Sequence, residues 1–199
     1  MTLLEEFEIA VRDCMFEILN KYTLSKDIKY MKLHKGQSIL WNINRKRYSS
    51  TDRKVLAFLA NICLPLNTSN RYGQTLLHVA IEEGNIQLFD DLISLQAAVD
   101  IPDDTGMTPL FYAVACRNTY FVEQLIMLEV NADSIDDEGW NPFMYLLIRM
   151  TQENEDLQTV YDIGKILLKH MNITETTKRN IEEICKYLDR MDIYKLLEN

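Results

Sequence analysis

An eight-residue phrase occurs three times in this chain of 199 residues, at a constant interval. The copies begin at Gly73, Gly106 and Gly139, which are 33 residues apart, and an acidic or amide residue precedes each glycine by three positions. A fixed period of this length indicates that the chain repeats one supersecondary unit. Each such unit buries its apolar face against its neighbours, so the repeat constrains the fold more strongly than any other feature of the sequence.

The phrase itself predicts a turn followed by two helices. The three copies read GQTLLHVA, GMTPLFYA and GWNPFMYL. Glycine supplies the backbone freedom that a turn needs, and Thr75 or Thr108 stands where a hydroxyl can cap the first helix. Pro109 falls in the first helical turn, where a missing N–H costs nothing. A second helix is predicted from apolar residues at helical spacing, which are Leu88, Phe89, Leu92 and Ile93 in one copy and Phe121, Val122, Leu125 and Ile126 in the next.

The order of glycine, threonine, proline, leucine and histidine, together with the period of 33, resembles the ankyrin repeat, in which a β-turn precedes two antiparallel helices. The resemblance implies an all-α ankyrin-repeat solenoid of about four turn-bearing repeats with a degenerate cap at each end. We expect a single domain with these divisions: N-terminal cap helices at 1–33, a repeat with an inter-helix insertion at 34–69, regular repeats at 70–102 and 103–135, a repeat with an insertion at 136–172, and C-terminal cap helices at 173–199.

Two repeats depart from the regular length. The first of them opens at Gly36, 37 residues before Gly73. We place its extra residues in the polar segment 44–52, because the pattern of the second helix resumes at Val55, Leu56, Phe58 and Leu59. The other insertion is expected at 151–158, before the helical pattern of Val160, Ile163, Ile166, Leu167 and Leu168.

The helix ends also depart from the ankyrin pattern, which usually places glycine there. Cys63, Gln96 and Glu129 occupy these positions, and a left-handed backbone costs a residue other than glycine about 1 kcal/mol. At the C-terminal end we expect helices at 175–188 and 192–197. The residues expected to face the preceding repeat are Ile181, Ile184, Cys185 and Leu188.

Composition and charge exclude several classes of function. The net charge of −9 argues against direct binding to nucleic acid or anionic lipid, because both need a basic surface. No apolar run reaches the length that spans a membrane, and the N-terminal residues lack the basic start of a secretion signal. We therefore expect no membrane association and a cytoplasmic location, with the nucleus as an alternative.

No catalytic or metal-binding motif stands out in the sequence. His34, His78 and His170 fall in three different repeats, and the four cysteines are far apart. We therefore expect a protein that is not an enzyme and has no cofactor, no metal site and no disulfide framework. His78 occupies the position at which the ankyrin family uses the ring to brace turns by hydrogen bonding, so we interpret it as structural.

A basic cluster at 45–47, with Arg53 and Lys54 nearby, has two interpretations. It could be a nuclear-import signal or a nucleic-acid patch. The simpler interpretation, which we favour, is a solvated loop in an otherwise acidic chain.

The ankyrin resemblance implies a protein-binding surface built from the turn tips and the outward positions of each first helix. Carried over by position, this surface comprises Tyr72, Gln74, Glu82, Glu83, Asp104, Met107, Asp137, Glu138, Trp140, Ile148 and Arg149. Tyr72, Met107 and Trp140 each adjoin a repeat glycine, and side chains of this kind form the energetic centres of interfaces. Trp140 could instead pack against the insertion that follows Met150.

The carboxylates around these positions predict the chemistry of the partner. An apolar row with an acidic edge suits a protein that offers an apolar ridge flanked by lysine and arginine. The length and the number of repeats resemble ankyrin-only regulators of the cell cycle, which implies a regulatory subunit of a protein kinase complex that controls the cell cycle or DNA replication. The alternatives are an inhibitor-of-NF-κB-like protein that sequesters a basic partner, and a substrate-recruiting adaptor of a ubiquitin ligase.

Overall fold

A computed structural model describes residue 41 and residues 48–61, 66–149, 157–189 and 191–195. The expected N-terminal cap at 1–33, the opening of the first repeat at Gly36 and the basic cluster at 45–47 lie outside these residues. The chain divides into two compact units, Met1–Asp104 and Thr105–Asn199, and each is described by itself. Within the described residues the regular elements are helices, apart from one isolated antiparallel bridge between Ser69 and Thr75.

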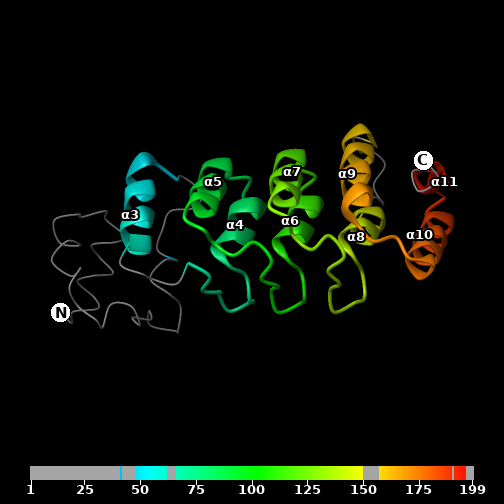
Figure 1. The fold of residues 1–199 in the computed structure, drawn as a ribbon, viewed down its shortest axis with the longest axis horizontal. Helices are drawn as coiled ribbons and strands as arrows, with labels where there is room; N and C mark the ends of the chain where they lie inside the picture. The colour runs from blue at the N-terminus through cyan, green and yellow to red at the C-terminus, as the bar shows by residue number, and fades with distance from the viewer. Residues whose placement is uncertain (1–40, 42–47, 62–65, 150–156, 190, 196–199) are drawn as a thin grey trace. The chain divides into compact units, whose positions relative to one another are not determined.

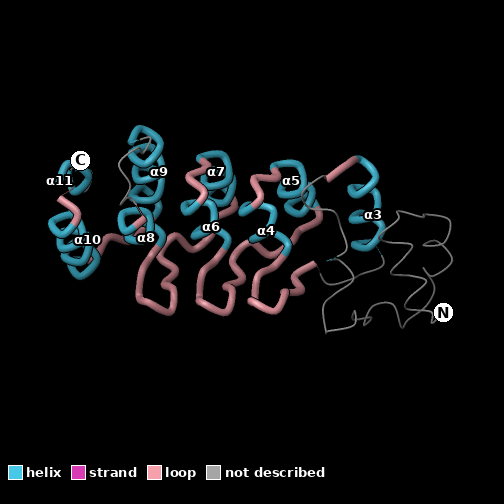
Figure 2. Tube along the Cα trace, turned by 180° about the vertical axis from the view of Figure 1, so that it is seen from behind, coloured by secondary structure: helices cyan, strands magenta, loops and turns pink. Residues whose placement is uncertain are grey.

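The first unit contains α3 (Ser50–Asn61), α4 (Leu76–Glu82) and α5 (Ile86–Ser94). Helices α4 and α5 lie side by side as the predicted pair (Figures 1 and 2). Helix α3 begins at Ser50, so positions 50–52 of the segment in which the extra residues were expected are helical, and positions 44–47 lie outside the described residues. The start is fixed by a reciprocal pair, in which the Ser49 amide donates to Oδ2 of Asp52 (2.9 Å) and the Asp52 amide donates to Oγ of Ser49 (3.3 Å).

The described residues of the second unit form three successive pairs of helices. They are α6 (Pro109–Ala115) with α7 (Thr119–Met127), α8 (Pro142–Ile148) with α9 (Leu157–His170), and α10 (Glu175–Tyr187) with α11 (Met191–Tyr194). Figure 2 shows the long loop between α7 and α8 extending away from the helices. Helices α10 and α11 form a pair within the segment 173–199, where the C-terminal cap was expected, and positions 196 and 197 of the expected second helix lie outside the described residues.

The apolar positions of the repeat form the core. The second-helix residues Leu88, Phe89, Leu92, Phe121, Val122, Leu125 and Ile126 are all buried, as predicted, and Ile93 is half-buried. Ala80 and Ala113, on α4 and α6, are fully buried. Such small residues let neighbouring helices approach closely, so stability comes from packing between adjacent helix pairs.

The N-terminal caps of the first helices differ between repeats. Thr75 and His78 form a reciprocal pair in which the Thr75 amide donates to the buried Nδ1 of His78 (3.0 Å). The hydroxyl of Thr108 makes no cap bond, contrary to prediction, because the Phe111 amide donates to the Thr108 carbonyl instead (3.0 Å). In the third copy Oδ1 of Asn141 accepts from the Met144 amide (2.8 Å), as an N-cap side chain should.

Residues other than glycine occupy left-handed backbone at several helix ends. Gln96 and Glu129 have φ of 62° and 58°, as the repeat pattern predicted, and Cys63 lies outside the described residues. Arg117 also has a positive φ, of 52°, one repeat length after Gly84 at 65°. Each such position costs about 1 kcal/mol relative to glycine, so these ends are weaker than they could be.

A polar cluster links α3 to α5 in the first unit. Oδ2 of Asp91 accepts from the hydroxyl of Tyr48 (2.9 Å) and from Nε of Arg53 (2.7 Å). Asp91 is largely buried, whereas the Arg53 side chain is about half exposed. Arg53, which the sequence grouped with the basic cluster, therefore takes part in an ion pair within the fold.

We expect Tyr48→Phe to lower the free energy of unfolding by about 1 kcal/mol at neutral pH, through loss of the hydrogen bond to Asp91. Burial, and then that hydrogen bond, raise the pKa of Tyr48 above its ordinary value of 10.0. The unfolded state therefore loses the proton first, so the contribution of Tyr48 is present below about pH 10 and declines above it. Urea unfolding of both proteins from about pH 7 to pH 11 should show the difference shrinking; a constant difference would contradict this.

Candidate functional site

Buried or half-buried polar side chains hold the repeat turns in shape. Oδ1 of Asn70 accepts from the amides of Tyr72 (2.8 Å) and Gln74 (3.1 Å). Oδ1 of Asp136 accepts in the same way from the amides of Glu138 (3.0 Å) and Trp140 (2.9 Å). The amide or carboxylate three positions before the glycine thus organises the backbone, and the side chains at the tip are directed by the turn.

Successive turns also bond to each other. The Asp104 amide donates to the Tyr72 carbonyl (3.1 Å) in the first unit, and the Asp137 amide donates to the Thr105 carbonyl (3.0 Å) in the second. Gly73 and Gly106 lie against these neighbours, so that a Cβ at Gly73 would be 2.3 Å from the Asp104 nitrogen and one at Gly106 would be 2.9 Å from the Asp137 nitrogen. Glycine is therefore required at both positions for space as well as for φ.

The candidate residues of the first unit differ in exposure. Tyr72 is 55% exposed at the turn tip, with the guanidinium of Arg71 4.7 Å from the centre of its ring. Glu82, Glu83 and Asp104 are exposed. Gln74 is half-buried, and its Oε1 accepts from Nδ2 of Asn70 (2.7 Å), so this side chain serves the turn.

In the second unit, the structure brings two of the candidates together, Trp140 at the turn and Ile148 at the end of α8. Trp140 is half-buried, and its Nε1 donates to Oε2 of the exposed Glu138 (3.1 Å). Ile148 is half-buried, and Arg149 is exposed with its guanidinium 5.9 Å from the Tyr145 ring centre. Asp137 is exposed, and Met107 is half-buried. The continuous row expected across both units stays a prediction.

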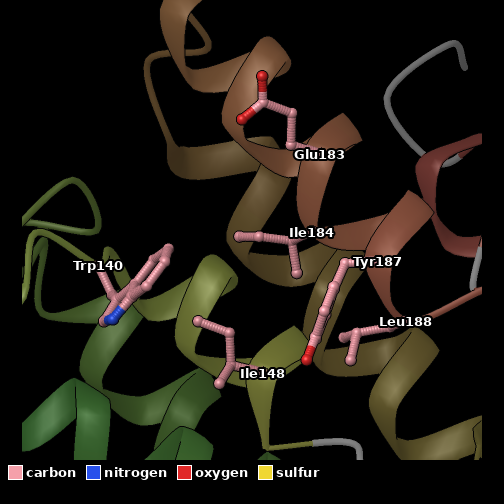
Figure 3. A pocket seen from close by; sticks show the side chains of 6 residues that line it. All are labelled: Trp140, Ile148, Glu183, Ile184, Tyr187 and Leu188. Atoms are coloured by element: carbon pink, nitrogen blue, oxygen red, sulfur yellow. The ribbon is translucent and has the colours of Figure 1, made fainter.

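Trp140 and Ile148 line a cavity of about 380 Å³ that also involves α10. Figure 3 shows Trp140 and Ile148 on one side, and on the other Ile184 and Tyr187 of α10 with Leu188, the residue that follows this helix. Glu183 lies at the edge with its carboxylate directed away from these apolar side chains. The cavity is thus lined mainly by apolar side chains, with Glu183 at its edge, and Glu138 is hydrogen-bonded to the lining residue Trp140.

The cavity changes the interpretation of two groups of residues. Ile181 and Cys185 are buried, as expected of a cap helix, but Ile184 and Leu188 are only half-buried, because they face the cavity. Trp140 shares this cavity with α10, and the expected insertion at 151–158 lies outside the described residues except for its last two positions. Tyr187, which is 89% exposed, was missed by sequence reasoning, although it lies one helical turn after Ile184.

Two further findings concern chemistry and membranes. Across the described ranges, no group of three or more histidine, cysteine, aspartate or glutamate side chains is arranged to hold a metal ion. In the same part of the chain, no helix has both the length and the apolar character that crossing a bilayer requires.

The comparisons with known proteins agree with this geometry. A family model for ankyrin repeats, described as three copies, matches residues 77–177. The crystal structure of an ankyrin repeat domain from Acinetobacter baumannii superimposes with a TM-score of 0.74 at 15% sequence identity, over 96% of this chain and 95% of that one. No curated protein matches the sequence significantly. The chain belongs to the ankyrin-repeat family, whose helix pairs and turns form protein-interaction modules.

Proposed function

We propose that this protein is a non-enzymatic regulator that acts by binding another protein through its turn tips and the ends of its first helices. The observation that carries the proposal is the cluster of Trp140, Glu138 and Ile148, where an apolar surface adjoins carboxylates. Aromatic side chains in partly desolvated positions supply most of the energy of protein interfaces. A net charge of −9 favours a partner whose apolar surface is flanked by basic residues.

We propose further that the partner is a protein kinase complex and that the regulation concerns the cell cycle or DNA replication, in the cytoplasm or the nucleus. This finer proposal rests on a resemblance in length and number of repeats to the small ankyrin-type inhibitors of cyclin-dependent kinases and to the ankyrin-only cell-cycle regulator Plutonium. The acidic surface also supports a second candidate, an inhibitor-of-NF-κB-like protein that sequesters a basic partner.

Affinity capture tests the proposal with a matched pair of variants. We expect the intact protein to retain a protein partner and the Met107→Ala, Trp140→Ala double variant to lose it, because two apolar anchors of the turn tips are removed. Met127→Ala is the control, since Met127 is 75% exposed but lies on a second helix, α7. A retained kinase supports kinase regulation. Equal capture by the intact protein and the double variant, at equal helicity, would contradict the proposed surface.

A further inference from the structure

The turn at 136–140 differs from the two turns before it. The carbonyls of Tyr72 and Thr105 each accept a hydrogen bond from the next turn, at 3.1 Å and 3.0 Å. Glu138 occupies the corresponding position, and its carbonyl accepts no backbone hydrogen bond from any residue that the structure describes. A Cβ added to Gly139 would meet no atom of a described residue within 4 Å, in contrast to Gly73 and Gly106. Among the residues that the structure describes, none therefore covers one face of this turn.

The length of the following loop explains why no turn covers it. Helix α10 contacts α8 as α8 contacts α6, so α10 takes the place of the first helix of a next repeat. Residues 128–141 separate α7 from α8, but only residues 171–174 separate α9 from α10. A loop this short cannot extend to the tip of the preceding turn. The space that a further turn would fill is thus left open beside Trp140.

The cavity of about 380 Å³ opens beside this vacant position. Ile184 and Tyr187 of α10, together with Leu188 at its C-terminal end, lie across the cavity from Trp140 and Ile148 (Figure 3). Tyr187 is 89% exposed, although aromatic side chains of this size gain most by burial. The volume falls in the usual range for ligand pockets, about 300–1,000 Å³, and accommodates bulky apolar side chains.

We propose that this cavity binds a short segment of a partner protein, and that the segment carries a bulky apolar side chain beside a lysine or arginine. The inference rests on the proposed function and specifies the chemistry of the partner. The apolar side chain enters between Trp140 and Tyr187, and the segment covers the turn as a further turn would, with a backbone N–H directed to the Glu138 carbonyl.

The carboxylates near the cavity favour a segment with a basic residue. Glu138 keeps one carboxylate oxygen beyond the one that accepts from Trp140, and Glu183 forms no ion pair among the described residues. The nearby Lys186 is paired with Glu182. A lysine or arginine of the partner can therefore approach these carboxylates and the face of the indole ring, which attracts cations. An acidic segment would be repelled.

Selection from a phage-displayed library of random peptides tests the proposal with the full-length protein. We expect the enriched peptides to place phenylalanine, leucine, methionine or tryptophan beside lysine or arginine. The protein has two tryptophans, so its indole N–H signals in nuclear magnetic resonance spectra form a direct reporter. A synthetic enriched peptide should shift the Trp140 signal and leave that of the buried Trp41 unchanged.

Variants on α10 then show whether the peptide binds at the cavity or elsewhere on the surface. Tyr187→Ala and Glu183→Lys, both at exposed positions, should each raise the Kd of the peptide about tenfold or more, whereas Met127→Ala should leave it unchanged. The effect of Glu183→Lys should diminish at high salt.

Several results would overturn the inference. Enriched peptides that lack basic residues would contradict it. Peptides whose Kd is the same for the intact protein and for both α10 variants would also contradict it. A concentration-dependent dimer that Tyr187→Ala dissociates would show that the occupant is a second copy of this chain. If the Met107→Ala, Trp140→Ala variant loses its protein partner while the α10 variants retain full binding, the proposed function is supported. The inference that the cavity binds the partner segment is then wrong.

Discussion

Gly73→Ala is expected to lower the free energy of unfolding by about 2–5 kcal/mol. The backbone at Gly73 has a φ of +76°, which costs an alanine about 1–2 kcal/mol. An added Cβ would also lie 2.3 Å from the Asp104 nitrogen and 2.8 Å from the Asp103 carbonyl carbon. Both are backbone atoms, and the Asp104 amide donates a hydrogen bond to the Tyr72 carbonyl. Moving these atoms to make room for the Cβ therefore disrupts the contact between the two turns. Overpacking of this kind costs about 1–3 kcal/mol or more.

The other two repeat glycines supply matched controls. Gly139 has a φ of +85°, and no described residue lies within 4 Å of its Cβ position, so Gly139→Ala should show the conformational cost of about 1–2 kcal/mol alone. A Cβ at Gly106 would lie 2.9 Å from the Asp137 nitrogen, so the loss of stability in Gly106→Ala should lie between those of Gly73→Ala and Gly139→Ala. Urea unfolding followed by far-ultraviolet circular dichroism gives the order of the three losses. Equal losses at Gly73 and Gly139 would contradict the packing of turn against turn.

Phe111→Ala should destabilise the second unit by about 3–5 kcal/mol, the usual cost of removing a buried phenylalanine ring. Phe111 is fully buried on α6, and its ring meets that of Tyr145 on α8 edge to face, with centroids 5.7 Å apart. Its removal leaves a cavity between two adjacent repeats, where the stability of a repeat protein resides.

Met127→Ala serves again as the control, because 75% of the Met127 side chain is already exposed and its loss should change stability by less than about 0.5 kcal/mol. The same urea titration measures both variants. A loss below about 1 kcal/mol for Phe111→Ala would mean that α6 and α8 are not held together by this core.

Much of the local structure could be predicted because it depends on residues close together in the sequence. The left-handed backbone at Gln96 and Glu129 follows from counting one repeat length, and counting from Gly84 would also have found Arg117. Residues 50–52 were grouped with the polar segment 44–52, although the hydrogen bonds between Ser49 and Asp52 place the start of α3 there. The hydroxyl of Thr108 was assigned a cap that the carbonyl of the same residue provides.

The candidate site was less predictable. The turn positions of Trp140 and Glu138 follow from the repeat, but their hydrogen bond depends on side-chain rotamers. Ile184 and Leu188 fitted the pattern of buried cap residues, and periodicity alone does not distinguish a closed interface from an open cavity. Gln74 was assigned to the surface, although its oxygen is engaged by Asn70 within the turn.

The sequence by itself determined the ankyrin fold, the turns at Gly73, Gly106 and Gly139 and the buried residues of the second helices α5 and α7, because a period of 33 repeats the same local preferences and apolar spacing. Only the tertiary structure decided that the turn at 136–140 has an uncovered face and that α10 places Tyr187 beside Trp140. The physical reason is that both features depend on how far the loop at 171–174 can reach and on how α10 packs against α8. Contacts between residues distant in the chain settle these points, and a repeat pattern does not record them.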